Sequence, residues 1–178
     1  MLTLDELEAG WQALPRQPRS SGVVRLLCVR KGDGVHETPD AVEITAAHGV
    51  HGDRWAERAP GTDPEGYSAI TLMSAAAIEL LAAERLPLHA AGDNIVVDFD
   101  LSVEVLPAGT RLVIGDSVLR VSEEPHTGCS RFRDRFGLEA LKWVSTPSGR
   151  ARRLRGVNCS VVRAGMVCVG DEIRALEG

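Results

Sequence analysis

Residues 111–121 have the sequence RLVIGDSVLRV, and this stretch decides the fold class. Two short apolar runs, residues 111–114 and 118–121, flank the turn Gly115-Asp116-Ser117. Such runs on either side of a glycine-containing turn are typical of a β-hairpin. We therefore predict two adjacent antiparallel strands here.

The same pattern of short apolar runs and glycine turns recurs from residue 22 onward. It predicts further strands at residues 23–29, 41–45, 69–73, 94–97, 157–162 and 167–169, and a last strand that ends near Ala175. The runs 157–162 and 167–169 flank Ala164-Gly165, which predicts a second hairpin. Many short strands with few helices indicate a mainly β (α+β) fold, a closed or nearly closed β-barrel with a few peripheral helices.

Three segments have helical patterns. In residues 3–14, Thr3 and Glu6 match a capping box ahead of apolar residues at helical spacing. Ser74 is expected to cap a helix that Pro87 ends, and Ser130 is expected to cap a helix over residues 130–144. We assign residues 1–21 to an N-terminal helix and linker, and residues 22–178 to the barrel domain.

Composition narrows the function classes. The chain has 178 residues, enough for one domain, and a net charge of −5, which argues against a general nucleic-acid-binding protein. Its four cysteines form no CxxC pair and have no zinc-ligand spacing. The sequence has no signal-peptide pattern and no apolar run of membrane-spanning length. We therefore expect a cytoplasmic protein without a membrane partner.

Cys129 is the most informative candidate site residue. A thiol acts as a nucleophile or metal ligand only as the thiolate, which nearby cations favour. His126, Arg131 and Arg133 lie close to it in sequence. A buried structural thiol is the commoner role of a cysteine, but polar neighbours favour the functional interpretation here. The other three cysteines lie in strand-like runs and are interpreted as core or strand residues: Cys28, Cys159 and Cys168.

A basic segment follows Cys129 in this acidic chain. Residues 126–155 contain eight basic side chains against two acidic ones. A solvated face with mixed ion pairs is one interpretation, and a site for an anion is the other, since arginine matches phosphate and carboxylate oxygens. The position of the segment favours an anionic small molecule near Cys129. RNA is the second choice of partner, but few aromatic residues are available for base stacking, so we predict no nucleic-acid partner.

Residues 48–55 form a second informative stretch, HGVHGDRW, with Asp53 and Arg54 after a glycine. Such a loop presents backbone N–H groups and an arginine to an anion. The alternative is a structural turn in which Asp53 pairs with Arg54 or caps local backbone. Asn94, at the start of a predicted strand, is suited to bind a ligand or its own turn.

The order of several short motifs resembles one known family. These motifs are Gly49–Arg54, Ile70–Ser74, Gly92–Val97, Leu106–Leu112, Ile114–Asp116, Cys129, Leu154–Val157 and Val169–Asp171. In this order and spacing, from about Val23 to Ala175, the chain resembles the MOSC domain, the C-terminal domain of molybdenum-cofactor sulfurase.

The resemblance implies a β-barrel-like fold with a cysteine in a cleft. Members of the family bind the pyranopterin molybdenum cofactor or carry sulfur on that cysteine, and some reduce N-hydroxylated compounds with electrons from a separate reductase. Cys129 matches the family cysteine and would ligate molybdenum. Asp53, Arg54 and Asn94 match family positions that suggest cofactor binding. Trp55 departs from the histidine often found there, and a single cysteine replaces two prolyl-cysteine pairs. The sequence shows neither the fused aminotransferase domain nor the ferredoxin-like tail of other members, so a stand-alone, bacterial-type member is expected.

Three functional hypotheses follow. In the first, Cys129 ligates molybdenum or accepts sulfur, and Arg54, Arg131 and Arg155 hold the cofactor phosphate or an anionic substrate. His126 would then act in catalysis by favouring the thiolate or passing a proton. The second is a metal-free persulfide carrier that receives sulfur from a cysteine desulfurase. The third is a non-catalytic module that binds an anionic ligand.

Overall fold

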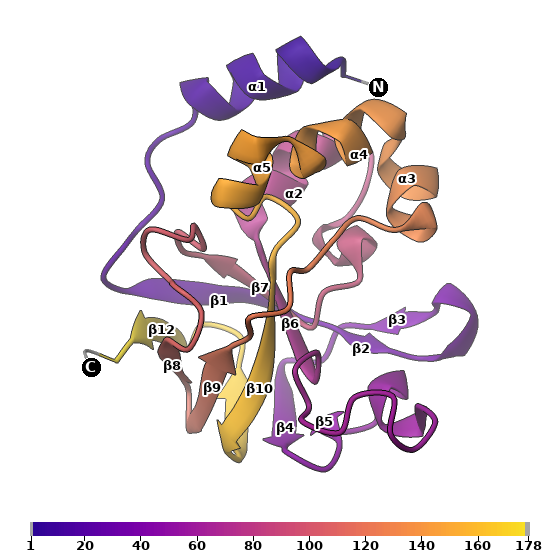
Figure 1. Ribbon diagram of the computed structural model, residues 1–178, viewed down its shortest axis with the longest axis vertical. Helices are drawn as coiled ribbons and strands as arrows, with labels where there is room; N and C mark the ends of the chain where they lie inside the picture. Colours follow the sequence, from indigo (N-terminus) through magenta and orange to yellow (C-terminus); the bar gives the residue numbers. More distant parts are fainter. Residues whose placement is uncertain (1, 177–178) are drawn as a thin grey trace.

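The computed structural model describes residues 2–176, and its centre is a closed seven-stranded β-barrel (Figure 1). Around the barrel the strands are β1 (Gly22–Leu27), β12 (Glu172–Ala175), β8 (Arg111–Ile114), β9 (Ser117–Val121), β10 (Val157–Arg163), β6 (Ile70–Ser74) and β7 (Ile95–Asp98). β7 pairs with β1 and closes the ring. β6 and β7 run parallel, and every other neighbouring pair in the ring is antiparallel. The predicted barrel is confirmed.

The predicted hairpin at residues 111–121 is also confirmed. β8 and β9 pair in the register Ile114↔Ser117, and Gly115 has a φ of +54° in the turn between them. This backbone conformation is left-handed, and glycine adopts it without steric cost because it has no Cβ atom.

The second predicted hairpin is wrong. β11 (Gly165–Cys168) pairs with β4 (Ala41–Thr45) rather than with β10, and β4 in turn pairs with β5 (Gly49–Val50). β10 pairs instead with β9 along Cys159–Arg163 and with β6 along Val157–Cys159. Pairing with β4 also places Val167 opposite Val42, and both side chains are buried against the barrel core.

Five helices gather at one end of the barrel (Figure 1). They are α1 (Leu4–Ala13), α2 (Ala75–Ala82), α3 (Ser130–Phe136), α4 (Leu138–Ser145) and α5 (Pro147–Ala151). Beside them, a two-stranded arm of β2 (Val29–Arg30) and β3 (His36–Glu37) projects from the barrel, with the short helix η1 (Gly32–Gly34) between its strands. Two further single turns are η2 (Arg54–Glu57) and η3 (Leu88–Ala91). No helix in the described part of the chain has the length and apolar character needed to cross a bilayer.

The helix caps agree with the sequence only in part. The capping box of Thr3 and Glu6 is present at the start of α1. Ser74 occupies the N-cap position of α2, but its hydroxyl makes no cap hydrogen bond. The N-cap of α3 is Cys129 rather than Ser130, and the predicted helix over 130–144 breaks into α3 and α4 at Gly137, where φ is +93°. Cys129 therefore lies at the N-terminus of the short helix α3.

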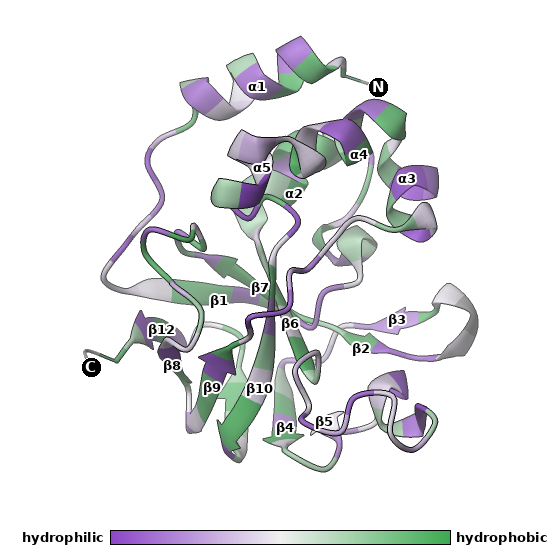
Figure 2. Cartoon of the chain, in the orientation of Figure 1, coloured by the Kyte–Doolittle hydropathy of each residue, from purple (hydrophilic) through white to green (hydrophobic). Residues whose placement is uncertain are grey.

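The apolar side chains form two cores. One fills the barrel, with Leu72, Ile95 and Leu112 fully buried, and the strands are accordingly mostly hydrophobic in Figure 2. The other joins α1 to the remaining helices through Leu7 and Trp143. Because the two cores meet at the end of the barrel, polar groups caught between the barrel and the helices have few routes to solvent. The candidate site lies at this boundary.

Candidate functional site

Cys129 is exposed and lines a cavity of about 170 Å³ between α3, the β2–β3 arm and η2, which we call the Cys129 cavity. The alternative of a buried structural thiol therefore does not describe Cys129. It describes Cys28 and Cys159, which are buried, and whose burial raises the pKa of each thiol to about 12. Cys168 lies on β11 as a strand residue, but it is exposed. Two of the four thiols are thus accessible, and one of these opens onto a cavity.

Among the described residues, the charged side chains that line the Cys129 cavity are all basic. These side chains are Arg30, Lys31, Arg54, Arg131, Arg135 and Arg155, and two histidines, His36 and His126, join them. They come from segments that are far apart in sequence: the β2–β3 arm, η2, α3 and the residues just before β10. A concave surface lined by charge of one sign focuses its potential on a ligand of the opposite sign. The lining of the cavity would therefore attract an anion.

Arg30 is held at the cavity by Asp53. Its Nε and Nη2 atoms donate hydrogen bonds to both carboxylate oxygens of Asp53 at 2.9 to 3.2 Å, and its backbone N–H donates a further one at 2.7 Å. Burial alone would raise the pKa of Asp53, but the hydrogen bonds and charge of Arg30 outweigh it, and the pKa is lowered. Asp53 also accepts from the backbone N–H of Trp55, which caps η2. One buried carboxylate therefore fixes both the arm and the loop that carries Arg54.

Asn94 extends this network into the barrel. Its side-chain amide donates to Asp53 at 3.0 Å and to the carbonyl of Cys28 at 3.2 Å, and its oxygen accepts from the backbone N–H of Thr71. Asp53 and Asn94 are 2% and 1% exposed. Neither side chain lines the Cys129 cavity. Both lie behind its wall, where they hold the residues that do.

A second ion pair joins Arg155, which lines the cavity, to the buried Asp93, which does not. Arg155 Nη1 donates to Asp93 at 2.7 Å, and the guanidinium lies 5.1 Å from the centre of the Phe132 ring. His126 Nδ1 lies 3.4 Å from the other oxygen of Asp93, without the geometry of a hydrogen bond. Burial first, and then the charge of Arg155, lower the pKa of His126 to about 4. His126 is therefore a neutral imidazole at pH 7.

Three atoms of this cluster are buried without a hydrogen-bond partner among the described residues: Asp93 Oδ1, His126 Nδ1 and Arg155 Nε. Buried polar atoms are almost always paired, and an unpaired donor or acceptor costs about 1–3 kcal/mol. Arg155 and His126 both line the Cys129 cavity. Their unpaired nitrogens therefore mark a place where a ligand or an ordered water would complete the hydrogen bonding.

Three arginines at the cavity form no salt bridge with a described side chain: Arg54, Arg131 and Arg135. Arg135 donates to the carbonyl of Ala90, whereas the side chains of Arg54 and Arg131 have no hydrogen bond to the described residues. Burial first, and then the positive charges of Arg131 and Arg30, lower the pKa of Arg54. A bound anion would relieve this repulsion between the arginines. Arg54 and Arg131 are thus the residues most available to that anion.

The structure brings together five of the seven residues predicted for the site: Cys129, His126, Arg54, Arg131 and Arg155. Sequence reasoning missed Arg30, Lys31, His36 and the contribution of Arg135, whose Nη1 donates to the carbonyl of Ala90 at 2.8 Å. A signal for Arg30 was present, since the charged pair Arg30-Lys31 directly follows an apolar strand. The basic segment does not act as one surface, because Arg133, Lys142 and Arg152 pair with acidic residues outside the cavity.

The sequence profile of the MOSC domain matches residues 41–174, which is most of the chain. This chain belongs to the MOSC domain family. None of the curated protein sequences gives a significant match. The family is associated with molybdenum-cofactor binding and with sulfur-related roles.

Solved structures share the fold of this MOSC domain. The YuaD protein from Bacillus subtilis has a TM-score of 0.66 and 19% identity, over 90% of this chain and 98% of that one. YiiM from Escherichia coli has a TM-score of 0.56 and 16% identity, over 92% and 71% of the two chains. YiiM from Geobacillus stearothermophilus has a TM-score of 0.51 and 16% identity, over 92% and 76%. At these identities the likeness concerns the fold.

The site of this MOSC domain fits the end of a phosphorylated, metal-bearing ligand. The exposed thiol supplies a soft ligand atom, and the unpaired Arg54, Arg131 and Arg155 Nε supply positive charge and a free donor. In residues 2–176, no group of three or more His, Cys, Asp and Glu side chains converges as a metal site. A metal at Cys129 would therefore have one side-chain ligand from such residues and would bring its other ligands with it. The cavity is smaller than the roughly 300–1,000 Å³ of whole-ligand sites, so it suits one end of such a cofactor.

Proposed function

We propose that this MOSC domain binds the pyranopterin molybdenum cofactor, with Cys129 as the protein ligand of the metal. The observation that carries the proposal is an exposed thiol in a cavity whose six other charged side chains are all basic. When bound, the cofactor supplies two-electron redox chemistry of the kind with which some MOSC proteins reduce N-hydroxylated compounds.

The residues of the chain have separate tasks in this proposal. Arg54 and Arg131, which have no acidic partner, bind the anionic group. Arg30 and Arg155 are oriented in advance by Asp53 and Asp93, so they lose little side-chain entropy when a ligand binds. Preorganised charge of this kind contributes more to binding and catalysis than charge that must first be ordered.

His126 is the proposed proton carrier. With a pKa of about 4 it is neutral at pH 7, so it has one N–H donor and one free lone pair. It lines the cavity while its Nδ1 faces Asp93. It can therefore accept a hydrogen bond from a protonated group in the cavity, or donate one, without adding another positive charge.

Metal analysis tests the proposal directly. Protein purified without chelators from a host that makes the cofactor is expected to contain molybdenum in near-stoichiometric amount, measured by inductively coupled plasma mass spectrometry. Cys129→Ser should lose most of the metal. Cys168→Ser is the matched control, because Cys168 is the other exposed thiol but lies outside the cavity. Equal metal contents in both variants would refute a role of Cys129 as ligand.

The exposure of Cys129 also favours a second candidate, a sulfur carrier that needs no metal. The Cys129 thiolate would attack the sulfane sulfur of a cysteine desulfurase persulfide. The sulfur–sulfur bond of the donor breaks, a new one forms at Cys129, and the donor cysteine leaves as a thiolate. Intact-mass spectrometry after incubation with desulfurase and cysteine should then show a gain of about 32 Da, one sulfur atom. Protein with neither molybdenum nor this adduct, but with anion binding intact, would be a non-catalytic binding module.

A further inference from the structure

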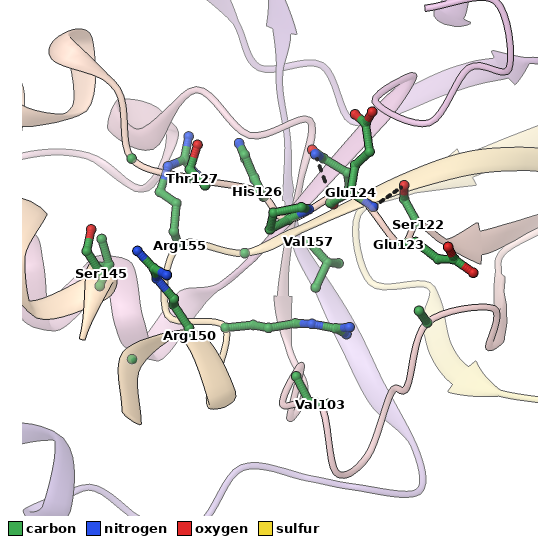
Figure 3. A pocket seen from close by; sticks show the side chains of 18 residues that line it. Val103, Ser122, Glu123, Glu124, His126, Thr127, Ser145, Arg150, Arg155 and Val157 are labelled. Atoms are coloured by element: carbon green, nitrogen blue, oxygen red, sulfur yellow. Dashed lines mark hydrogen bonds between the residues drawn. The ribbon is translucent and has the colours of Figure 1, made fainter. Parts of the chain in front are cut away.

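A second, larger cavity of about 480 Å³ is lined on one side by residues 125–128 (Figure 3). We call it the α5 cavity, and it is lined among others by Val103, Val144, Arg150, Arg153, Arg155 and Val157. Its volume falls within the roughly 300–1,000 Å³ of small-molecule sites. His126 and Arg155 line both cavities and form the partition between them. The function proposed above makes no use of this space.

Two arginines of the α5 cavity lack a counter-ion. Arg150 and Arg153 form no salt bridge with any side chain in the described range, whereas Arg152 between them pairs with Glu8 at 2.8 Å. Arg150 is exposed at the end of α5. Unpaired guanidinium groups on an open surface are ordinary, but two on the wall of one cavity raise its affinity for an anion.

Arg153 is held in place at a conformational cost. Its φ of +51° lies in the left-handed region, which a non-glycine residue occupies at a cost of about 1–3 kcal/mol. Its Nη1 atom donates to the backbone carbonyls of Leu106 and Leu101. These bonds use only one of the three guanidinium nitrogens and bring no opposite charge. The half-buried guanidinium therefore has no opposite charge beside it within the described chain. In agreement, burial lowers the pKa of Arg153.

The other walls define the rest of the ligand. Val103 is exposed and gives the cavity apolar surface, and Glu123 and Glu124 lie at the end opposite Arg150 and Arg155 (Figure 3). An anionic group is attracted to the arginine end and repelled by the glutamate end. An uncharged body of the ligand would then lie over Val103, where burial of apolar area adds affinity.

We propose that the α5 cavity binds a small organic anion, with its charged group at Arg150 and Arg153 and a ring-sized apolar body against Val103. This site is separate from the Cys129 cavity, and it does not depend on whether molybdenum binds there. The shared chemistry of the ligand is one carboxylate or phosphate group on an apolar body.

Phenyl phosphate is a suitable probe, with inorganic phosphate and neutral phenol as its two halves. Titration of the full chain, followed by calorimetry and by ¹H–¹⁵N NMR, should show saturable binding of phenyl phosphate. Inorganic phosphate and phenol should each bind at least about tenfold more weakly, because each loses one of the two contacts. The amide signals of Gly149 and Gly156, which line the α5 cavity, should shift, and those of Gly34 and Gly92 in the Cys129 cavity should not.

Variants locate the anionic group. Arg150→Gln should weaken phenyl phosphate binding about tenfold or more by removing a charge-assisted hydrogen bond. The side chain of Arg150 is exposed and makes no hydrogen bond within the described chain, so this variant should fold normally. Arg153→Gln should weaken binding as well, and Arg150→Gln keeps the test valid if Arg153→Gln fails to fold. Arg111→Gln, an exposed arginine on β8, is the matched control and should bind as the native chain does. The proposal is overturned if phenyl phosphate does not bind, if Arg150→Gln and Arg111→Gln bind equally, or if only Arg131→Gln reduces binding, which would place the anion beside Cys129.

Discussion

The guanidinium of Arg30 donates hydrogen bonds from Nε and Nη2 to the carboxylate of Asp53, 23 residues further along the chain. The side chain of Asp53 is fully buried, and that of Arg30 is 15% exposed. The pair connects the β2–β3 arm to the loop of Arg54, so it fixes two walls of the Cys129 cavity at once. Asp53 thus organises a cationic site from behind while itself remaining out of reach of a ligand.

Removal of that carboxylate should be costly. In Asp53→Asn the partly buried Arg30 loses its counter-ion, and breaking an ion pair out of contact with water costs about 3–5 kcal/mol. The free energy of unfolding, measured by urea titration at pH 7, should fall by this amount. Asp98→Asn is the control, because Asp98 pairs with Arg25 on the surface, where such pairs contribute about 0–1 kcal/mol. Similar losses in the two variants would show that Arg30 does not depend on Asp53.

Local patterns made part of the fold predictable. The hairpin at residues 111–121 and the capping box of Thr3 and Glu6 depend on residues only a few positions apart, and both are confirmed. The partner of β11 depends on which strand edges are free after the barrel closes, and the sequence pattern contains no such information. The same limit explains why a continuous helix was predicted across Gly137, where the chain turns so that Phe132 and Trp143 can pack in one core.

The candidate site shows the same division. Cys129, His126 and Arg131 lie close in sequence, so the sequence alone predicts that they lie near one another. Arg30 reaches the cavity only because Asp53 is buried beside β2, a contact across 23 residues. The resemblance to a family suggested cofactor binding for Asp53 and Asn94, whereas their observed hydrogen bonds are to other parts of the chain.

The four thiols should differ in reactivity. In the native protein, Cys129 and Cys168 are exposed and should react with iodoacetamide, whereas Cys28 and Cys159 should stay unmodified. Burial raises the pKa of the latter two to about 12, so neither access nor ionisation favours reaction. Peptide mapping by mass spectrometry before and after addition of denaturant gives the measurement. Rapid native labelling of Cys28 or Cys159 would contradict the burial seen here.

Charge should further separate the two exposed thiols. The dianionic disulfide 5,5′-dithiobis(2-nitrobenzoate) should react faster at Cys129 than at Cys168, because Cys129 lies in a cavity lined by cations and Cys168 lies outside it. The advantage should shrink in high salt and in Arg131→Gln, and it should be smaller for the neutral reagent 2,2′-dithiodipyridine. Stopped-flow kinetics on Cys168→Ser and Cys129→Ser isolate each thiol. A rate at Cys129 that is insensitive to salt and to Arg131 would mean that the cavity does not attract anions.

His126 should make stability depend on pH in a defined window. Its pKa is about 4 in the folded chain and about 6.5 in an unfolded one, so the unfolded chain binds more protons between these values. The free energy of unfolding should therefore rise from pH 4 to pH 6.5 by about 3 kcal/mol and gain nothing more from His126 above it. His126→Asn should flatten this slope in urea titrations across the window. Because the lowered pKa of Asp53 affects stability only as pH falls below about 4, the two effects are separable. An unchanged slope in His126→Asn would assign the pH dependence to other groups.

Gly156 and Gly170 offer a matched test of how the backbone sets the position of Arg155. Both have a left-handed φ, +99° and +92°, so replacement by alanine strains each backbone by about 1–3 kcal/mol. A Cβ at Gly156 would also collide with the carbonyl oxygen of Leu72 in β6, whereas a Cβ at Gly170 would meet open space. This overpacking should cost Gly156→Ala about 1–3 kcal/mol more than Gly170→Ala in urea unfolding.

The same collision would push β10 away from β6 and draw the neighbouring Arg155 off Asp93. Where Gly156→Ala still folds, it should therefore also lose the preference of Cys129 for the dianionic disulfide, and Gly170→Ala should keep it. Equal stability of the two variants would mean that β10 can shift without cost. The close approach of Gly156 to β6 would then not be what positions Arg155 at the wall that the two cavities share.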